Sequence, residues 1–198
     1  NFLKQIQNKK INNLINQLKE IKNNNNLIVC NFANFTLRKG GDIFKNIARE
    51  LDKKNNSNIF FVWIGLNKDK DKILKNNEKY KNLIFFEKVN NIFPILEYID
   101  VLMINSRDEG GPTILLEGMY FNKLCLTHIN CGFSERIIEN NKNGFFVNKN
   151  ETNEYIYYLN HIASNYKMYD DIKSNGHNKI YNQFDILKKI DLIEEILN

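Results

Sequence analysis

The chain has 198 residues, 42% hydrophobic and 26% charged, which is the composition of one globular domain with a single core. Its longest apolar run, residues 59–66, is far too short to cross a bilayer. The net charge of +5 comes from lysines interspersed with acidic residues rather than from a basic stripe, which argues against nucleic-acid binding. Three cysteines without metal-ligand spacing indicate buried thiols in a reducing compartment, so we expect a cytoplasmic protein.

Strand and helix patterns alternate along the first half of the chain. Apolar residues at helical spacing predict a helix over 2–22, and the Asn-rich run 23–26 predicts a linker. The elements expected after it are a strand over 27–32, a helix over 42–52, a strand over 59–64, a Lys-rich helix near 69–78, a strand over 83–86, a short helix over 92–98 and a strand over 101–104. The nearly continuous apolar strand over 59–64 is typical of a sheet covered on both faces.

The second half continues the alternation and ends in helices. We expect a helix over 112–121, strands over 125–128 and 145–147, and helices over 151–163, 165–182 and 185–197. Strands joined by helices through short connections predict parallel βαβ units, so the fold class is α/β with a doubly wound parallel sheet. We expect the main domain to span 27–184, preceded by the helix and linker of 1–26 and followed by a C-terminal helix over 185–198.

Residues 109–117, Glu-Gly-Gly-Pro-Thr-Ile-Leu-Leu-Glu, carry the most specific signal. Proline favours the first helical position, so we expect Pro112 at N1 and free amides at Thr113 and Ile114, a terminus that attracts phosphate. Glu117 lies one turn further on the Thr113 face, where it could hold ribose hydroxyls, and Glu109 is left for a group attached to the phosphate. On spacing alone, a surface helix with two solvated glutamates explains the segment equally well.

Further segments surround this helix start in a fixed order: 27–40 ending in Leu37-Arg38-Lys39-Gly40, 59–65, 100–110, 125–128, Gly132 to Ile138, and Asn143 to Val147. Together with the Glu-x7-Glu helix start, they resemble the donor domain of retaining glycosyltransferases with the GT-B fold, specifically glycosyltransferase family 4. The resemblance covers about residues 27–165. The resemblance implies a Rossmann-like half of a GT-B fold that binds a nucleotide-diphosphate sugar.

The resemblance also assigns roles to the site residues. Glu109 faces the donor sugar, Glu117 holds the ribose, and Gly110 and Gly111 with Thr113 and Ile114 offer main-chain groups to sugar and phosphate. Lys39 and Arg38 grip the diphosphate, and the catalytic residues are Glu109 and Lys39. No cofactor and no metal ion is expected, because cationic side chains and the helix dipole stabilise the leaving diphosphate.

Two positions depart from the family pattern. The family has a Gly-Arg pair about five residues before Lys-Gly, where this chain has Ala33 and Asn34. Either Arg38 replaces the missing arginine, or the donor binds more weakly. The family also has a glycine where Glu87 stands, which leaves base recognition open.

The resemblance makes this chain a hexosyltransferase-type enzyme half. Since the family's acceptor binds a separate N-terminal lobe, and this chain starts at Asn1 without a signal peptide, we expect a fragment that binds donor but hardly transfers sugar. The expected partners are the nucleotide sugar, the missing lobe and, in the whole enzyme, a peripheral membrane contact. The alternatives are a non-catalytic binding module and another GT-B enzyme such as a sugar-nucleotide epimerase. A flavodoxin-like signalling domain is more distant, because the first strand does not end in an acidic pair.

Overall fold

The computed structural model describes residues 2–53, 58–66 and 80–184. These residues form a six-stranded, wholly parallel sheet with the strand order β3-β2-β1-β4-β5-β6. The strands are β1 (Leu27–Phe32), β2 (Ile59–Leu66), β3 (Leu83–Glu87), β4 (Val101–Ile104), β5 (Leu124–His128) and β6 (Phe145–Val147). The predicted doubly wound α/β sheet is therefore confirmed.

The strand order reverses direction between β1 and β4. From β1 the chain builds outward through β2 to β3, then returns to place β4 on the other side of β1, with Val29 opposite Val101. Such a reversal leaves the loops after the two central strands free to diverge, and ligands of open α/β sheets bind in the crevice between them. The loops after Phe32 and Ile104 are thus the place to look for a site.

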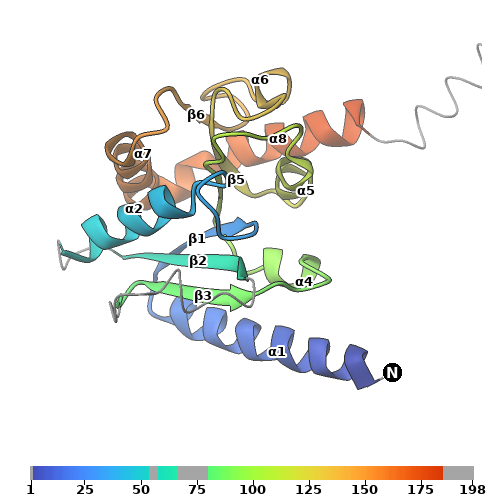
Figure 1. The fold of residues 1–198 in the computed structure, drawn as a ribbon. Coiled ribbons are helices and arrows are strands. Elements are labelled where there is room, and N and C mark those ends of the chain that lie inside the picture. The colour runs from blue at the N-terminus through green and yellow to red at the C-terminus, as the bar shows by residue number, and fades with distance from the viewer. Residues whose placement is uncertain (1, 54–57, 67–79, 185–198) are drawn as a thin grey trace, which may run out of the picture.

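Helices cover both faces of the sheet, and they make three layers (Figure 1). One face carries α2 (Gly41–Lys53) and α7 (Thr152–Asn165), and the other carries α1 (Phe2–Asn23), α4 (Phe93–Leu96), α5 (Thr113–Tyr120), α6 (Ser134–Ile137) and α8 (Asp170–Gln183). Side chains alternate between these faces, as the pleat requires: Val29 packs in the α2 layer, whereas Ile28 and Cys30 pack against α1. Strands buried on both faces explain their continuous apolar sequences.

The predicted boundaries match the observed ones to within a few residues, with identifiable exceptions. The segment predicted as one helix over 165–182 is a 3₁₀ turn, Tyr166–Tyr169, followed by α8, and the expected helix over 92–98 is the single turn α4. The short α6 was not expected. The helices predicted near 69–78 and over 185–197 lie outside the described residues.

Helix α1 is packed onto the sheet. Its residues Ile11, Leu14 and Leu18 are buried against Ile28 and Val62. Figure 1 shows α1 running along the α4 side of β2 and β3. The expected division at residues 26 and 184 stays a prediction.

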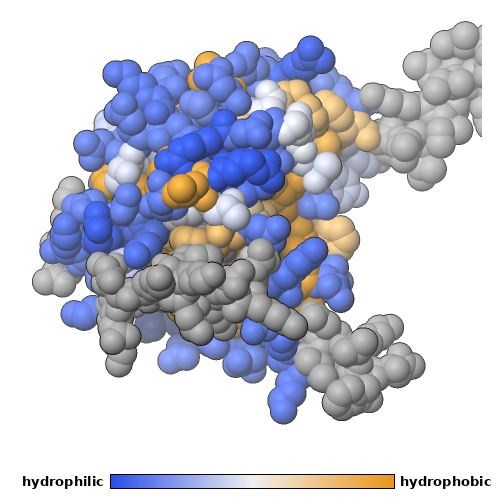
Figure 2. Space-filling model, in the orientation of Figure 1, coloured by the Kyte–Doolittle hydropathy of each residue, from blue (hydrophilic) through white to orange (hydrophobic). Residues whose placement is uncertain are grey.

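The described surface is mostly hydrophilic on the side seen in Figure 2, with apolar residues gathered where α4, α5 and α8 lie. Phe93 and Phe121 stack there with ring centroids 5.3 Å apart. In the described ranges, no helix has the length and apolar character that crossing a membrane requires.

Candidate functional site

Two loops meet at the point where the strand order reverses. Residues 33–40 follow β1 and residues 105–112 follow β4. At their junction, Lys39 Nζ forms an ion pair with Glu109 Oε2, and the two side chains are only 17% and 16% exposed. The residues predicted as catalytic, 70 positions apart in sequence, thus lie together and shielded from solvent.

Buried asparagines tie the carboxyl ends of β1 and β4 together. Asn31 Nδ2 donates to Asn105 Oδ1 at 2.9 Å, and Asn105 Nδ2 donates to the Gly40 carbonyl at 2.6 Å. Gly40 has a φ of +72°, and a Cβ there would lie 2.2 Å from the Asn105 carbonyl oxygen. Only glycine fits this conformation at this close approach, which explains why a glycine follows Lys39.

Arg107 joins the same loops on the outside. Its guanidinium binds both carboxylate oxygens of Asp42, at 2.7 and 2.8 Å, and donates to the Leu37 carbonyl at 2.5 Å. Partial burial acts to raise the pKa of the Asp42 carboxyl, but the hydrogen bonds and charge of Arg107 outweigh it, and the pKa lies below its ordinary value. Sequence reasoning missed both the Arg107 and the Asn105 contacts, because a pairing between distant loops has no local pattern.

The turn before α5 corrects one expectation. Pro112 is the N-cap rather than the first helical residue, with a ψ of 86°, and the helix begins at Thr113. The Thr113 N–H is not free, since it donates to the Gly111 carbonyl at 2.9 Å across an inverse γ-turn centred on Pro112. In the described part of the chain the Ile114 N–H has no acceptor, and it remains available at the positive end of the helix.

A second turn supports the one that precedes α5. A Cβ on Gly111 would lie 1.8 Å from Cε1 of Phe133, and one on Gly132, whose φ is +58°, would lie 2.8 Å from the Glu109 carbonyl oxygen. The segment Gly132-Phe133 is therefore packed directly against the Glu109 loop. Glu135 is exposed in the first turn of α6.

Two adjoining cavities open along these loops. The smaller, about 200 Å³, is lined by Lys39, Glu109, Thr113 and Ile114 among others. The larger, about 380 Å³, lies between the 88–93 loop, Gly65 and Glu117. Both contain Phe32, Ala33 and Ile114, so they form one groove. Burial raises the pKa of the Glu117 carboxyl in this groove.

Of the other residues discussed in the sequence, Asn34 lines the groove, whereas Arg38, Glu87, Gly110 and Gly111 lie beside it. Arg38 lines neither cavity, is 57% exposed, and donates to the Asp108 carbonyl at 3.1 Å. Asn34 lines the larger cavity. Glu87 stands at the end of β3 and pairs with Lys10 of α1 at 2.5 Å. Gly110 and Gly111 form the turn between the cavity-lining residues Glu109 and Pro112.

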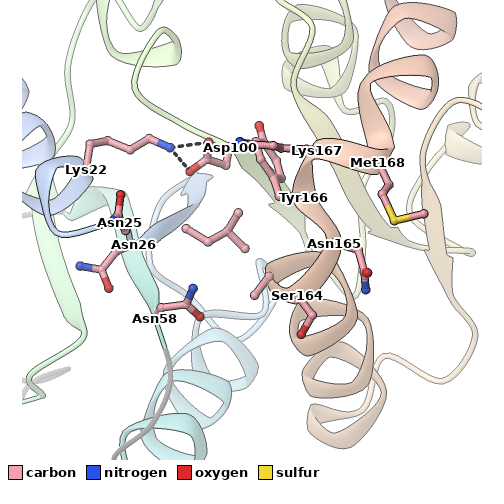
Figure 3. Close-up of a pocket in the computed structure, with 12 residues that line it drawn as sticks. Lys22, Asn25, Asn26, Asn58, Asp100, Ser164, Asn165, Tyr166, Lys167 and Met168 are labelled. Atoms are coloured by element: carbon pink, nitrogen blue, oxygen red, sulfur yellow. Dashed lines mark hydrogen bonds and ion pairs between the residues drawn. The ribbon is translucent and has the colours of Figure 1, made fainter.

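A third cavity, of about 570 Å³, lies at the opposite end of the sheet (Figure 3). It adjoins the start of β1, where the Asp100 carboxylate pairs with Lys22 and accepts the Ile28 N–H at 2.8 Å. The buried Asp100 already has hydrogen-bond and ion-pair partners. The cavity lies at the amino ends of the strands, whereas open α/β sheets bind ligands at the carboxyl ends. We therefore place the site in the groove at the carboxyl ends of the strands.

The described residues give the groove no nucleophilic thiol and no ready-made metal site. All three cysteines are buried, as expected, and burial raises the pKa of Cys131 to about 11, so its thiol stays protonated. Across the described ranges, no three His, Cys, Asp or Glu side chains cluster as metal ligands would. Metal-free binding remains a prediction.

Comparison with known proteins identifies this arrangement. Residues 9–179 match the family described as glycosyl transferases group 1. The chain belongs to this family. Its sheet and helices are one Rossmann-like half of the GT-B fold, as the resemblance implied.

Relatives show the fold and the extent of the match. The structure of HepE from Anabaena, in complex with UDP and glucose, has a TM-score of 0.77 and 17% identity over 93% of this chain and 51% of that one. The C-terminal domain of LpcC, a glycosyl transferase group 1 family protein from Francisella tularensis, has a TM-score of 0.70 and 18% identity over 85% of this chain and 93% of that one. An Escherichia coli UDP-Gal:α-D-GlcNAc-diphosphoundecaprenol α-1,3-galactosyltransferase is 28% identical over 59% of this chain. This chain spans 30% of that enzyme and about half of HepE.

Proposed function

We propose that this chain is the donor-binding half of a retaining hexosyltransferase that binds a nucleotide-diphosphate sugar without a metal ion. The observation that carries the proposal is the shielded Lys39–Glu109 pair at the strand-order reversal, in a groove that Glu117 also lines. A cation for the diphosphate and an acid for the sugar line one cavity of the groove, and an acid for the ribose lines the other. Membership of the family supports this assignment.

Each part of the donor has a place in the groove. The base fits the larger cavity beside the 88–93 loop, and the ribose hydroxyls donate to Glu117. The diphosphate receives Lys39 and the Ile114 N–H, and the sugar extends to Glu109 in the smaller cavity. Arg38 starts outside the groove and reaches the diphosphate only if it leaves the Asp108 carbonyl, so Lys39 carries most of the phosphate contact.

The mechanism follows from these places. The bond between the sugar's anomeric carbon and the diphosphate oxygen breaks, and the electron pair leaves with the nucleoside diphosphate. Lys39 and the start of α5 stabilise that growing negative charge, while the Glu109 carboxylate lies beside the oxocarbenium-like sugar. Both effects are stronger in the transition state than in the ground state, as catalysis requires.

We infer that UDP-sugars are the first donors to test, since HepE was solved with UDP and glucose and the Escherichia coli relative uses UDP-Gal. The acceptor would bind the half that this chain does not span. The relative's name gives its acceptor as α-D-GlcNAc-diphosphoundecaprenol, a sugar on a polyprenyl lipid, so a whole enzyme of this kind would work at a membrane surface. This chain alone would bind donor with little or no transfer.

The test is a thermal-shift series of UDP-, GDP- and ADP-sugars against this chain, with and without a chelator. A donor at about a hundred times its Kd should stabilise the fold by about 2.7 kcal/mol. We expect stabilisation by one nucleotide class, unchanged by the chelator. No response to any nucleotide sugar would contradict the proposal. A response that requires Mn²⁺ would contradict its metal-free part.

A further inference from the structure

We propose that Arg107 is a positioning residue, which holds Lys39 in place for the diphosphate by clamping the two site loops together. This inference rests on the proposed function. Arg107 itself lines neither cavity of the groove. It would act through Lys39, and through no contact of its own with the donor.

The contacts of Arg107 surround Lys39 on both sides in sequence. On one side, the Arg107 N–H donates to the Arg38 carbonyl at 2.8 Å, and its Nη1 donates to the Leu37 carbonyl at 2.5 Å. On the other side, its guanidinium binds both oxygens of Asp42, at 2.7 and 2.8 Å. Lys39 therefore lies between two segments that Arg107 binds, residues 37–38 and Asp42. Glu109 lies two residues after Arg107 in the sequence.

The loop needs such a clamp because of its sequence. Lys39 is followed directly by Gly40 and Gly41, and glycine leaves the backbone more freedom than any other residue. A lysine side chain also has several rotatable bonds, so its charge is useful only if its backbone is held. The planar guanidinium, binding a carboxylate and a carbonyl at once, restricts this loop in a way that a point charge does not.

The clamp contributes to geometry more than to stability. The Arg107 and Asp42 side chains are 43% and 35% exposed, and ion pairs at such exposure add little to the free energy of unfolding. Removing Arg107 should therefore leave the fold intact and loosen the loop. The loss should appear in the part of the affinity that comes from phosphate.

The experiment measures binding of UDP and of uridine to the whole chain by NMR titration. The quantity compared is the UDP affinity divided by the uridine affinity. Arg107→Ala should lower this ratio about tenfold while uridine affinity stays the same. Asp42→Asn should lower it in the same direction, and Arg107→Lys should lie between wild type and Arg107→Ala. Lys142→Ala, which removes an exposed ion pair with Glu139, is the matched control and should change neither affinity.

A double-mutant cycle with Lys39 separates positioning from the alternatives. In a Lys39→Ala background, adding Arg107→Ala should cost no further UDP affinity, because the group it positions is gone. A further loss of similar size would mean that Arg107 contacts the donor itself, and an equal loss for uridine would mean a general structural role. Either result overturns the inference. If the wild-type protein did not bind UDP, that result would instead contradict the proposed function, on which this inference rests.

Discussion

At the scale of single residues, the sequence identified the groups that face the groove, and it missed those that hold them. The family resemblance assigned Lys39, Glu109 and Glu117 to one site, and all three line the groove. Arg107 and Asn105 form their hydrogen bonds with residues 65 to 74 positions away in sequence. Such contacts depend on the relative placement of β1 and β4, which no local pattern contains.

Glu109→Gln should strengthen the binding of UDP that carries no sugar. In the free chain Lys39 is paired with Glu109, so a diphosphate must draw the lysine away and approach a carboxylate of like charge. Removing that charge should gain about 1 kcal/mol, roughly fivefold in Kd. Calorimetric titration with UDP measures it, with the exposed Glu135→Gln as control. Weaker UDP binding by Glu109→Gln would contradict this account of the pair.

In the full-length enzyme, the same Glu109→Gln change should lower turnover far more than donor affinity. Its charge matters most as the sugar becomes oxocarbenium-like, so the lost interaction belongs to the transition state. Comparing kcat with the Kd of the nucleotide sugar measures the two effects separately. Unimpaired turnover would show that Glu109 has no role in the chemistry.

Glu117→Ala should weaken nucleotide binding by about 1–3 kcal/mol without unfolding the domain, because the ribose hydroxyls lose their acceptor.

Glu117→Gln should gain stability over wild type as pH rises. Burial raises the pKa of Glu117 in the folded state, so the folded protein binds more protons than the unfolded one, and wild-type stability falls as pH rises through that window. Thermal unfolding of the wild type and of Glu117→Gln from pH 4 to 8 tests this pH dependence. A constant difference in Tm would contradict it.

At the scale of elements, strands were easier to predict than helix ends. The strands β1, β4 and β6 have the expected bounds, because short apolar runs between polar loops leave little choice of boundary. The start of α5 was one residue off, since Pro112 serves the inverse γ-turn before the helix as well as it would serve N1. The four-residue α6 is too short to show a helical period.

The Gly-Gly pair before α5 should respond unequally to a methyl group. Gly111→Ala places a Cβ 1.8 Å from Cε1 of Phe133, so the ring or the turn must move, and overpacking of this kind costs about 1–3 kcal/mol. At Gly110 a Cβ meets nothing within 4 Å, so Gly110→Ala is the matched control and should keep the wild-type Tm. Thermal unfolding compares them. Adding Phe133→Ala to Gly111→Ala should restore part of the lost stability, and equal Tm values for the two single variants would contradict this packing.

At the scale of the whole molecule, the alternation of strands and helices predicted the sheet, and its strand order places the site. The reversal between β1 and β4 brings Lys39 to Glu109. The cavity at the amino end of the sheet is larger than either cavity of the groove, but its buried Asp100 is fully partnered. Cavity size could not be read from the sequence, because it depends on how α1 and the 163–168 segment meet around the start of β1. The chemistry of the lining residues, rather than the volume, separates the two ends.

The central claim is that donor binds in the groove at the carboxyl ends of β1 and β4, and hydrogen–deuterium exchange with and without UDP tests it most directly. We expect added protection in the segments 33–40, 88–93 and 109–117, and no change at residues 22–27 and 163–168, which line the cavity at the other end. Protection confined to residues 22–27 and 163–168, with the three groove segments unchanged at saturating UDP, would contradict the account.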